Sequence, residues 1–384
     1  MIKIGIRNNL LYPLMFVIFL GARRLVKAIL GKTINYQSPF LLAFLMFFAE
    51  FVIGGIYAFY LNRKKKKIEK SKVMGITLIK NENELKRHDS DLKIIILMIL
   101  AAVIEFIGAI VRRYAIQEID NRYDVDDEGE QINTRLRSFE IIISSLLSYL
   151  ILRIKIYRHH IVTIIIIGIC LICGVIIELF KNMKIIFQSI LILITSTLSR
   201  AFLDIIEKHL FEKDFINVFK ITTFEGFIDT ILILFSYFLK APKDEIKDLF
   251  DLGGYKKPIA CILLIIYGVL SFYKNIYRRY TLNEYSPMTR ALAESIFDPI
   301  IIFCYYVDSG EYNNNDNNLY YTLFFLLSII MVFCSLVYNE FLVLYFCNME
   351  HDTYIEICKR AKEKDGTNTG YNNEEENMEK MNTY

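Results

Sequence analysis

The sequence predicts an all-α integral membrane protein whose ten transmembrane helices form two inverted repeats of five. Three observations lead to this fold class. Ten apolar stretches, each about 20 residues long and so able to cross a bilayer, fill most of the chain. Several of them carry charged residues near their middles, and a pattern in those charges recurs after five helices. With 384 residues, 54% of them hydrophobic, and a mean hydropathy of +0.35, the chain is too apolar for an ordinary soluble protein.

The apolar stretches follow one another with mostly short polar connections. They predict helices at Leu10–Leu30, Pro39–Leu61, Leu92–Val111, Leu136–Leu152, Ile161–Phe180, Ile185–Ile206, Ile221–Leu239, Pro258–Tyr277, Pro287–Val307 and Tyr320–Leu342. The first stretch contains Arg23 and Lys27 and lacks a small-residue cleavage site. We therefore interpret it as a membrane helix and not as a signal peptide.

Lysine and arginine are distributed unevenly over the polar connections. If the N-terminus is cytosolic, the cytosolic segments hold roughly 28 basic residues and the opposite side roughly 13. The largest contribution is a basic loop at about 62–93 containing the run Lys64–Lys67, which either sets the topology or acts in lipid binding or sorting. The acidic stretch Asp120–Glu130 falls on the other side. Both termini are expected in the cytosol, and the polar tail 347–384 is expected to be disordered.

Two pairs of helices repeat a charge pattern at an offset of five. Glu50 in the second helix and Glu225 in the seventh each adjoin a small residue. The fourth and ninth helices each open with an arginine followed one turn later by an acid, namely Arg137 with Glu140 and Arg290 with Glu294. An odd number of helices per repeat inverts the second repeat relative to the first, as in many secondary transporters. The predicted repeats are 1–180 and 181–346.

The ninth helix carries a charged stripe. Arg290, Glu294 and Asp298 are spaced four apart, which is only about 40° per step around a helix, so they share one face. One ion at a bilayer centre costs about 2.5–3.5 kcal/mol on insertion scales, so this face should contact protein or a water-filled cavity. Pro299 follows Asp298 and either kinks the helix or breaks it so that freed carbonyls can bind a solute.

Other helices add candidate residues for a polar cavity. The first three helices contribute Arg23, Glu50 and Glu105, and the seventh contributes Glu225 and Asp229. Charges close to helix ends, namely Lys27, Arg137 and Lys274, are expected to reach the interface instead. Arg200 and Asp204, at helical i, i+4 spacing, are the best candidates for a purely structural ion pair.

No pattern typical of an enzyme is present. His159 and His160 lie among basic residues in a short loop, and we interpret them as topology charge and not as a metal site. The sequence has no glycine-rich phosphate loop and no HExxH. No cofactor, metal or nucleic acid is therefore expected.

Short motifs in a fixed order resemble the drug/metabolite transporter superfamily (EamA-like), closest to the F-subgroup of solute carrier family 35 and its protist relatives. The motifs are Ser38-Pro39-Phe40, Met46 to Phe51, Leu136-Arg137-Ser138, Glu207-Lys208, Phe224-Glu225-Gly226, Asn275, Ser286, Thr289-Arg290, Glu294-Ser295 and Tyr338-Asn339. Asp229 stands where the family commonly has a second glycine, and Arg278 where it often has a small residue. The resemblance covers about Leu10 to Leu342.

The resemblance implies a ten-helix inverted-repeat fold, cytosolic termini and alternating access around a central cavity. Asn275 is a binding-site residue by this resemblance. We expect a secondary carrier of a small polar or charged metabolite in an internal membrane: Golgi, endoplasmic reticulum, lysosome or vacuole. Arg290 would contact an anionic group, and Glu294 or Asp298 a cationic group or a coupling proton. Glu50 and Glu225 would be their partners in the opposite repeat.

Two other classes remain open. The chain could be a non-transporting membrane adaptor or assembly factor recognised through its basic loop and tail, or a channel. Besides the solute, the expected partners are the lipid bilayer, with a coupling proton and a second copy of the chain as options.

Overall fold

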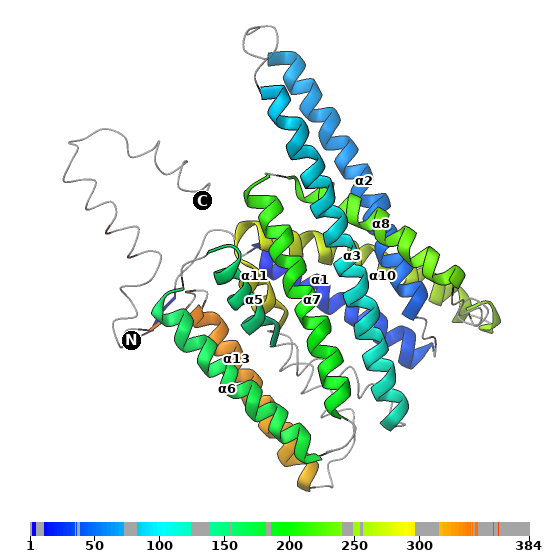
Figure 1. Cartoon of the computed structure of the whole chain (residues 1–384). Coiled ribbons are helices and arrows are strands. Elements are labelled where there is room, and N and C mark those ends of the chain that lie inside the picture. Colours follow the sequence, from blue (N-terminus) through cyan, green and yellow to red (C-terminus); the bar gives the residue numbers. More distant parts are fainter. Residues whose placement is uncertain are drawn as a thin grey trace.

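A computed structural model describes residues 2–4, 11–34, 36, 39–72, 83–123, 139–153, 156–181, 186–214, 216–239, 249–253, 256–295, 315–338, 340, 342–344, 356 and 360. Within this part the chain is almost entirely helical (Figure 1). Two short strands, β1 (Ile2–Ile4) and β2 (Leu342–Leu344), pair antiparallel and join the N-terminal end to the segment after the last helix.

Each of the ten predicted helices has a helical counterpart. They are α1 (Leu11–Ala28, continued by the π-helical turn Ile29–Thr33), α2 (Pro39–Lys72), α3 (Asn83–Tyr123), α5 (Phe139–Leu150), α6 (Arg158–Lys181), α7 (Ile186–Glu212), α8 (Val218–Leu239), α10 (Lys256–Glu284), α11 (Pro287–Ser295) and α13 (Asn315–Tyr338). The basic segment predicted as a loop at about 62–93 is partly helical, because α2 continues to Lys72 and α3 begins at Asn83. Lysine and glutamate favour helix, so the helices do not stop where the apolar residues stop.

Three of these helices are long and apolar enough to cross a membrane by length and composition: Phe40–Arg63, Leu92–Arg112 and Lys256–Glu284. Shorter apolar helices run over Phe139–Leu150, Arg158–Gly174 and Thr322–Tyr338. This pattern fits a multi-pass membrane protein. The full set of ten crossings stays a prediction.

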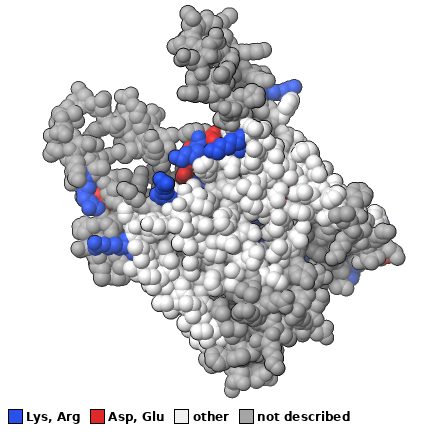
Figure 2. Space-filling view, viewed as in Figure 1, with Lys and Arg blue, Asp and Glu red and all other residues white. Residues whose placement is uncertain are grey.

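The described surface has the polarity that a bilayer requires. Large apolar side chains are exposed on several helices, among them Leu14, Ile56, Ile99, Ile169 and Ile265. Viewed from the side drawn in Figure 2, this surface is mostly uncharged, with acidic and basic residues gathered mainly near its upper edge. The interior, by contrast, holds many charged side chains. An apolar exterior around a charged interior is expected when hydrocarbon replaces water as the outer solvent.

Helices from the two ends of the chain interleave. α2 packs on α8, α3 on α7, α1 on α10 and α6 on α13. In Figure 1, α6 and α13 form a pair at one side, and α2 and α3 project beyond the rest at the top. Aromatic side chains join α1 to α10, since Phe19 stacks on Tyr273 and Tyr277 and Tyr12 stacks on Tyr280.

A glycine sets the closest helix approach. A Cβ at Gly226 on α8 would lie 2.7 Å from the backbone nitrogen of Phe51 and 2.8 Å from Glu50 Cβ on α2. Only glycine allows the two helices to touch here. The Glu225-Gly226 pair thus has a structural reason: the glycine brings α8 onto α2, and the adjacent glutamate enters the interior beside Glu50.

The turn between α10 and α11 is stabilised by hydrogen bonds within the turn and from α7. Ser286 Oγ accepts a hydrogen bond from the Thr289 backbone N–H at 3.1 Å, which caps α11, and Pro287 occupies its first position. Lys208 Nζ on α7 donates to the backbone carbonyls of Asn283 (2.9 Å) and Tyr285 (2.6 Å). This turn places the end of α10 and the start of α11 side by side against α7.

Candidate binding site: a buried charge network

Charged side chains inside the helix assembly form the candidate site. Ion pairs connect them into one set, which we call the buried charge network. Its members are Glu50, Glu105, Glu140, Arg200, Asp204, Glu207, Glu225, Arg278, Arg279, Arg290 and Glu294. They come from α2, α3, α5, α7, α8, α10 and α11, so no single segment of the chain builds the site.

Arg290 on α11 is the centre of one end. Its guanidinium donates to Glu140 and Asp204, and its Nη1 lies 3.0 Å from Glu294 Oε2. Arg200 Nη1 lies 3.3 Å from Glu294 Oε1 and 3.6 Å from Glu140 Oε2. Arg290 is fully buried, whereas the side chain of Arg200 is 26% exposed. Arg200 is therefore the arginine through which this end reaches the surface.

Arg279 on α10 is the centre of the other end. Its Nη1 lies 3.3 Å from Glu50 Oε2, and its Nε lies 2.9 Å from Glu207 Oε1. Its Nη2 lies 3.5 Å from Glu105 Oε2 and also donates to Glu225. One guanidinium thus contacts carboxylates from α2, α3, α7 and α8, which is more acid than a single arginine can neutralise.

Arg278 connects the two ends. Its Nη2 lies 2.6 Å from Glu207 Oε1, and its Nη1 lies 3.3 Å from Asp204 Oδ1. Asp204 also binds Arg290, and Glu207 also binds Arg279. The network is therefore continuous from α5 and α11 through α7 to α2 and α8.

Arg278 and Arg279 were not among the predicted site residues. The predicted helix ends at Tyr277 and leaves both arginines beyond it, whereas α10 continues to Glu284. A usable signal was present: they stand three and four residues after Asn275 and so share its helix face. The contacts of Asp204 and Glu207 with Arg278 were also not predicted, because nothing in the sequence indicates that α7 faces the end of α10.

Two predicted pairings are wrong. Arg200 and Asp204 do not pair with each other, because Arg200 contacts Glu140 and Glu294 while Asp204 contacts Arg278 and Arg290. Glu50 and Glu225 do not face Arg290 either; both contact Arg279. Spacing along a helix showed which side chains share a face, but not which neighbouring helix brings the opposite charge.

The remaining predicted site residues fall in different places. Asn275 Nδ2 donates to Glu50 Oε1, so Asn275 belongs to the Arg279 end. Arg23 lies outside the network: its guanidinium stands 5.7 Å from the ring centroid of Tyr267, and its Nη1 approaches Met46 Sδ at 3.7 Å. Asp298 lies outside the described residues, as does Arg137.

Lys274 differs from its prediction as well. Because α10 continues past Tyr277, Lys274 lies well inside the helix and is not a helix-end residue. It is half-buried, within electrostatic reach of Arg23, Arg200, Arg278 and Glu294. It therefore lies beside the Arg290 end. Lys27, by contrast, is exposed.

The charges do not balance. Together with buried Asp229, the network holds eight carboxyl groups against four arginines. The surplus is uneven, since five of the carboxyl groups lie around Arg279 and only three around Arg290. Uncompensated charge is costly in a low-dielectric interior. The network thus favours the binding of protons or cations, above all at the Arg279 end.

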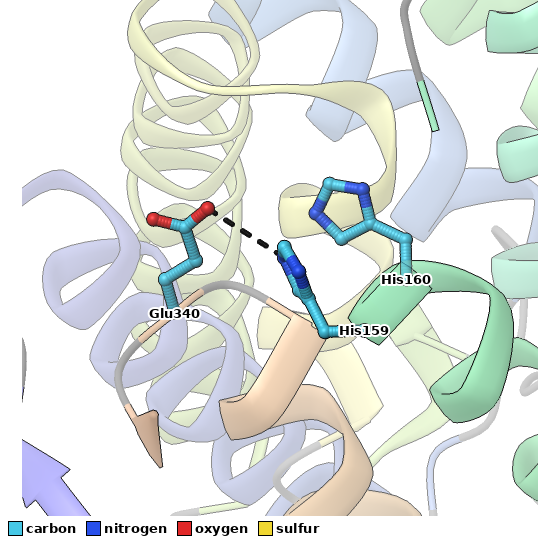
Figure 3. Close-up of side chains that lie close together, drawn as sticks. All are labelled: His159, His160 and Glu340. Carbon is cyan, nitrogen blue, oxygen red and sulfur yellow. Dashed lines mark ion pairs between the residues drawn. The ribbon is translucent and has the colours of Figure 1, made fainter. Parts of the chain in front are cut away.

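A second cluster lies apart from this network. His159 and His160 at the start of α6 and Glu340 after α13 lie close enough together to hold a metal ion (Figure 3). His159 Nε2 stands 3.5 Å from Glu340 Oε1, and Glu340 has a positive φ of 60°. The sequence had suggested only topology charge here.

The chemistry of His160 argues against a resident metal. Its Nδ1 accepts a hydrogen bond from the Tyr157 backbone N–H at 3.3 Å, and its ring packs on Tyr338 at 4.2 Å between centroids. With Nδ1 as acceptor, the neutral ring carries its proton on Nε2 and cannot ligate there. His160 precedes the apolar run that begins at Ile161. Burial lowers the pKa of His160 to about 3, and the neighbouring His159 contributes to this shift. We interpret the cluster as a contact that joins α6 to the segment after α13.

No protein-family model matches the chain, and no curated protein matches it in sequence.

Proposed function

We propose that the protein is a secondary transporter that moves a small charged solute across an internal membrane by alternating access. The observation that carries this proposal is the buried charge network inside an apolar helix assembly. A purely structural core of the same volume is at least as stable when built from apolar residues, because buried ion pairs barely offset their desolvation. A network of this size is better explained by a solute or ion that exchanges with its members.

The packing of the helices supports two inverted five-helix repeats. If α1, α2, α3, α5 and α6 correspond to α7, α8, α10, α11 and α13, most contacts have a counterpart. The contact between α1 and α10 then corresponds to the contact between α7 and α3. Likewise, the α2–α10 contact corresponds to the α8–α3 contact, and the α5–α7 contact corresponds to the α11–α1 contact. The pairs α2–α8, α5–α11 and α6–α13 correspond to themselves. Such a pattern is expected around a pseudo-two-fold axis.

The acids follow the same correspondence. Glu50 on α2 and Glu225 on α8 both contact Arg279, and Glu140 on α5 and Glu294 on α11 both contact Arg290. Each pair of corresponding acids thus shares one arginine at the interface between the proposed repeats. Solute sites of inverted-repeat transporters lie at such interfaces.

This arrangement suggests how binding could drive a conformational change. Ion pairs between helices of opposite repeats hold one packing of the repeats. A charged solute that binds one member of a pair weakens that pair and favours the alternative packing, to the extent of its differential affinity for the two. Arg200 and Glu294 are the natural first contacts, because Arg200 is the most exposed arginine of the network.

The test begins without a known substrate. Thermal unfolding of the purified full-length protein is measured against a panel of charged metabolites, since a ligand of the folded state raises its stability. Compounds that bind are offered to proteoliposomes carrying wild type, Glu294→Gln or the exposed control Asp251→Asn. Loss of a contact to a charged group, worth about 1.5–3 kcal/mol, predicts about ten- to hundredfold slower uptake for Glu294→Gln. The control should transport like wild type.

Folding of Glu294→Gln is checked by its unfolding temperature. Equal uptake by folded Glu294→Gln and wild type would overturn the assignment of this site. An adaptor would instead lose function on deletion of the tail and the Lys64–Lys67 run while tolerating neutralised network residues. A channel would show ion currents without saturation of solute flux.

A further inference from the structure

Besides Glu207, which Arg279 shares with Arg278, four carboxyl groups lie around Arg279. Glu50 comes from α2, Glu105 from α3, and Glu225 and Asp229 from α8. Glu50, Glu225 and Asp229 are fully buried, and the side chain of Glu105 is 14% exposed. Three of the four contact Arg279 directly; Asp229 does not. We call this set the acidic subsite.

Asp229 is the unusual member. It stands one helical turn after Glu225, on the same face of α8, and is 0% exposed. Neither carboxyl oxygen has a hydrogen-bond partner among the described residues. The charged groups that face it are Glu105, Glu225, Glu50 and Arg279, so three of its four charged neighbours are acids. In the corresponding position of α2, four residues after Glu50, the chain has Gly54.

Other buried oxygens around Arg279 also lack a hydrogen-bond partner. In the described part of the chain they include Glu105 Oε2, Glu225 Oε1 and Asn275 Oδ1, in addition to both oxygens of Asp229. Every one of these atoms is a hydrogen-bond acceptor. Buried polar groups are normally satisfied, so these oxygens call for a donor or a positive ion beside them.

We propose that the acidic subsite binds a small cation, either a proton shared between carboxylates or an alkali ion, with Asp229 as the residue that makes the site. This deepens the proposed transport function, because a cation bound here would be the coupling ion. A proton would convert one acid into a donor for its neighbour, and an alkali ion would take the free carboxylate and amide oxygens as ligands. Both satisfy the same acceptors with one positive charge.

The packing favours a compact cation over an organic one. Gly226 brings the backbones of α8 and α2 into contact immediately beside Glu225 and Glu50. A side chain as small as alanine would already lie 2.7 Å from the Phe51 nitrogen. An ammonium or guanidinium group attached to a larger solute would have to separate these helices, whereas a proton or a bare ion would not.

The test measures cation binding on the purified full-length protein in detergent, without transport. Unfolding temperature is recorded while sodium replaces choline at constant ionic strength, at mildly acidic and mildly alkaline pH. The proteins are wild type, Asp229→Asn, Glu105→Gln and the exposed control Asp251→Asn. The second substitution keeps the test valid if Asp229→Asn does not fold.

The expected result distinguishes the two cations. If sodium binds, wild type is stabilised by sodium at alkaline pH, and Asp229→Asn needs at least about tenfold more sodium for the same effect. If a proton binds, sodium has no effect, and a pH-indicator titration shows about one proton fewer taken up by Asp229→Asn than by wild type. Asp251→Asn should match wild type in the sodium response, because the side chain of Asp251 is exposed.

Identical sodium responses and identical proton uptake in wild type, Asp229→Asn and Glu105→Gln would overturn the inference. The proposed function is judged separately by uptake through Glu294→Gln. Cation binding without solute transport would keep the subsite and reject the carrier. Transport that is independent of sodium and of a pH gradient, with no cation bound, would keep the carrier and reject the subsite.

Discussion

Glu50 and Glu225 meet at the crossing of α2 and α8, and both bind the guanidinium of Arg279. Gly226 allows this meeting, since any side chain there would collide with the backbone of α2. The same crossing therefore explains the small residue, the two acids and the buried arginine together. It also places the acidic subsite at the interface between the proposed repeats.

Gly226→Ala should destabilise the protein. The added methyl group would lie 2.7 Å from Phe51 N and 2.8 Å from Glu50 Cβ, and overpacking of this kind costs about 1–3 kcal/mol. The free energy of unfolding, measured by denaturant titration in detergent, should fall accordingly. Gly253→Ala is the matched control, because nothing lies within 4 Å of its added methyl group. Equal losses in both variants would contradict the close approach of α2 and α8.

Arg279→Gln should be among the most damaging single substitutions. It leaves the carboxylates of Glu50, Glu207 and Glu225 without their shared cation, and breaking a buried pair on one side costs about 3–5 kcal/mol. Adding Glu225→Gln to this variant should recover part of the loss, because one uncompensated charge is removed. The exposed Lys220→Gln serves as control. A double variant no more stable than Arg279→Gln alone would argue against the pairing.

Asp229→Asn should raise stability when no cation is present. Its carboxylate lies among acids and lacks a hydrogen-bond partner in the described structure, so neutralising it removes repulsion. In sodium-free buffer at alkaline pH we expect a higher unfolding temperature than that of wild type. A lower temperature under these conditions would mean that Asp229 has a stabilising partner, and the acidic subsite would need revision.

Lys208→Gln should loosen the turn between α10 and α11. Lys208 Nζ donates to two backbone carbonyls there, at 2.9 and 2.6 Å, and loss of hydrogen bonds from a charged donor costs about 1.5–3 kcal/mol. The free energy of unfolding should decrease, while the sodium or proton response of the acidic subsite stays the same. Lys213→Gln, at an exposed position just after the end of α7, should change neither measurement.

The predicted topology can be checked with single cysteines. Lys213 lies between α7 and α8, and Asp251 lies between α8 and α10; both are exposed. If α8 crosses the membrane, Lys213→Cys and Asp251→Cys should react with a membrane-impermeant maleimide from opposite sides, with Lys213→Cys on the cytosolic one. Labelling of both from the same side would reject the ten-crossing topology.

The helices themselves were readable from the chain because hydrophobic runs of membrane length are a local property. Pro39 and Pro287 mark helix starts that the structure has at the same residues. The ends were less accurate: α10 continues beyond Tyr277 because nothing in the next residues breaks a helix, although apolar character ceases there. That extension moved Arg278 and Arg279 from a supposed loop into the site.

By itself, the sequence determined that this chain is helical and apolar, and that it carries acids such as Glu50, Glu225 and Glu294 where hydrocarbon would penalise them. Each of these features depends on residue type and on spacing within one segment. Only the tertiary structure decided the ion-pair partners. Arg279 pairs with Glu50 and Glu225, and Arg290 pairs with Glu140 and Asp204. Asp229 is left mainly among other acids. The reason is physical: an ion pair between helices depends on which faces meet when they pack, and that is settled by contacts such as Gly226 against Phe51, which no local pattern contains.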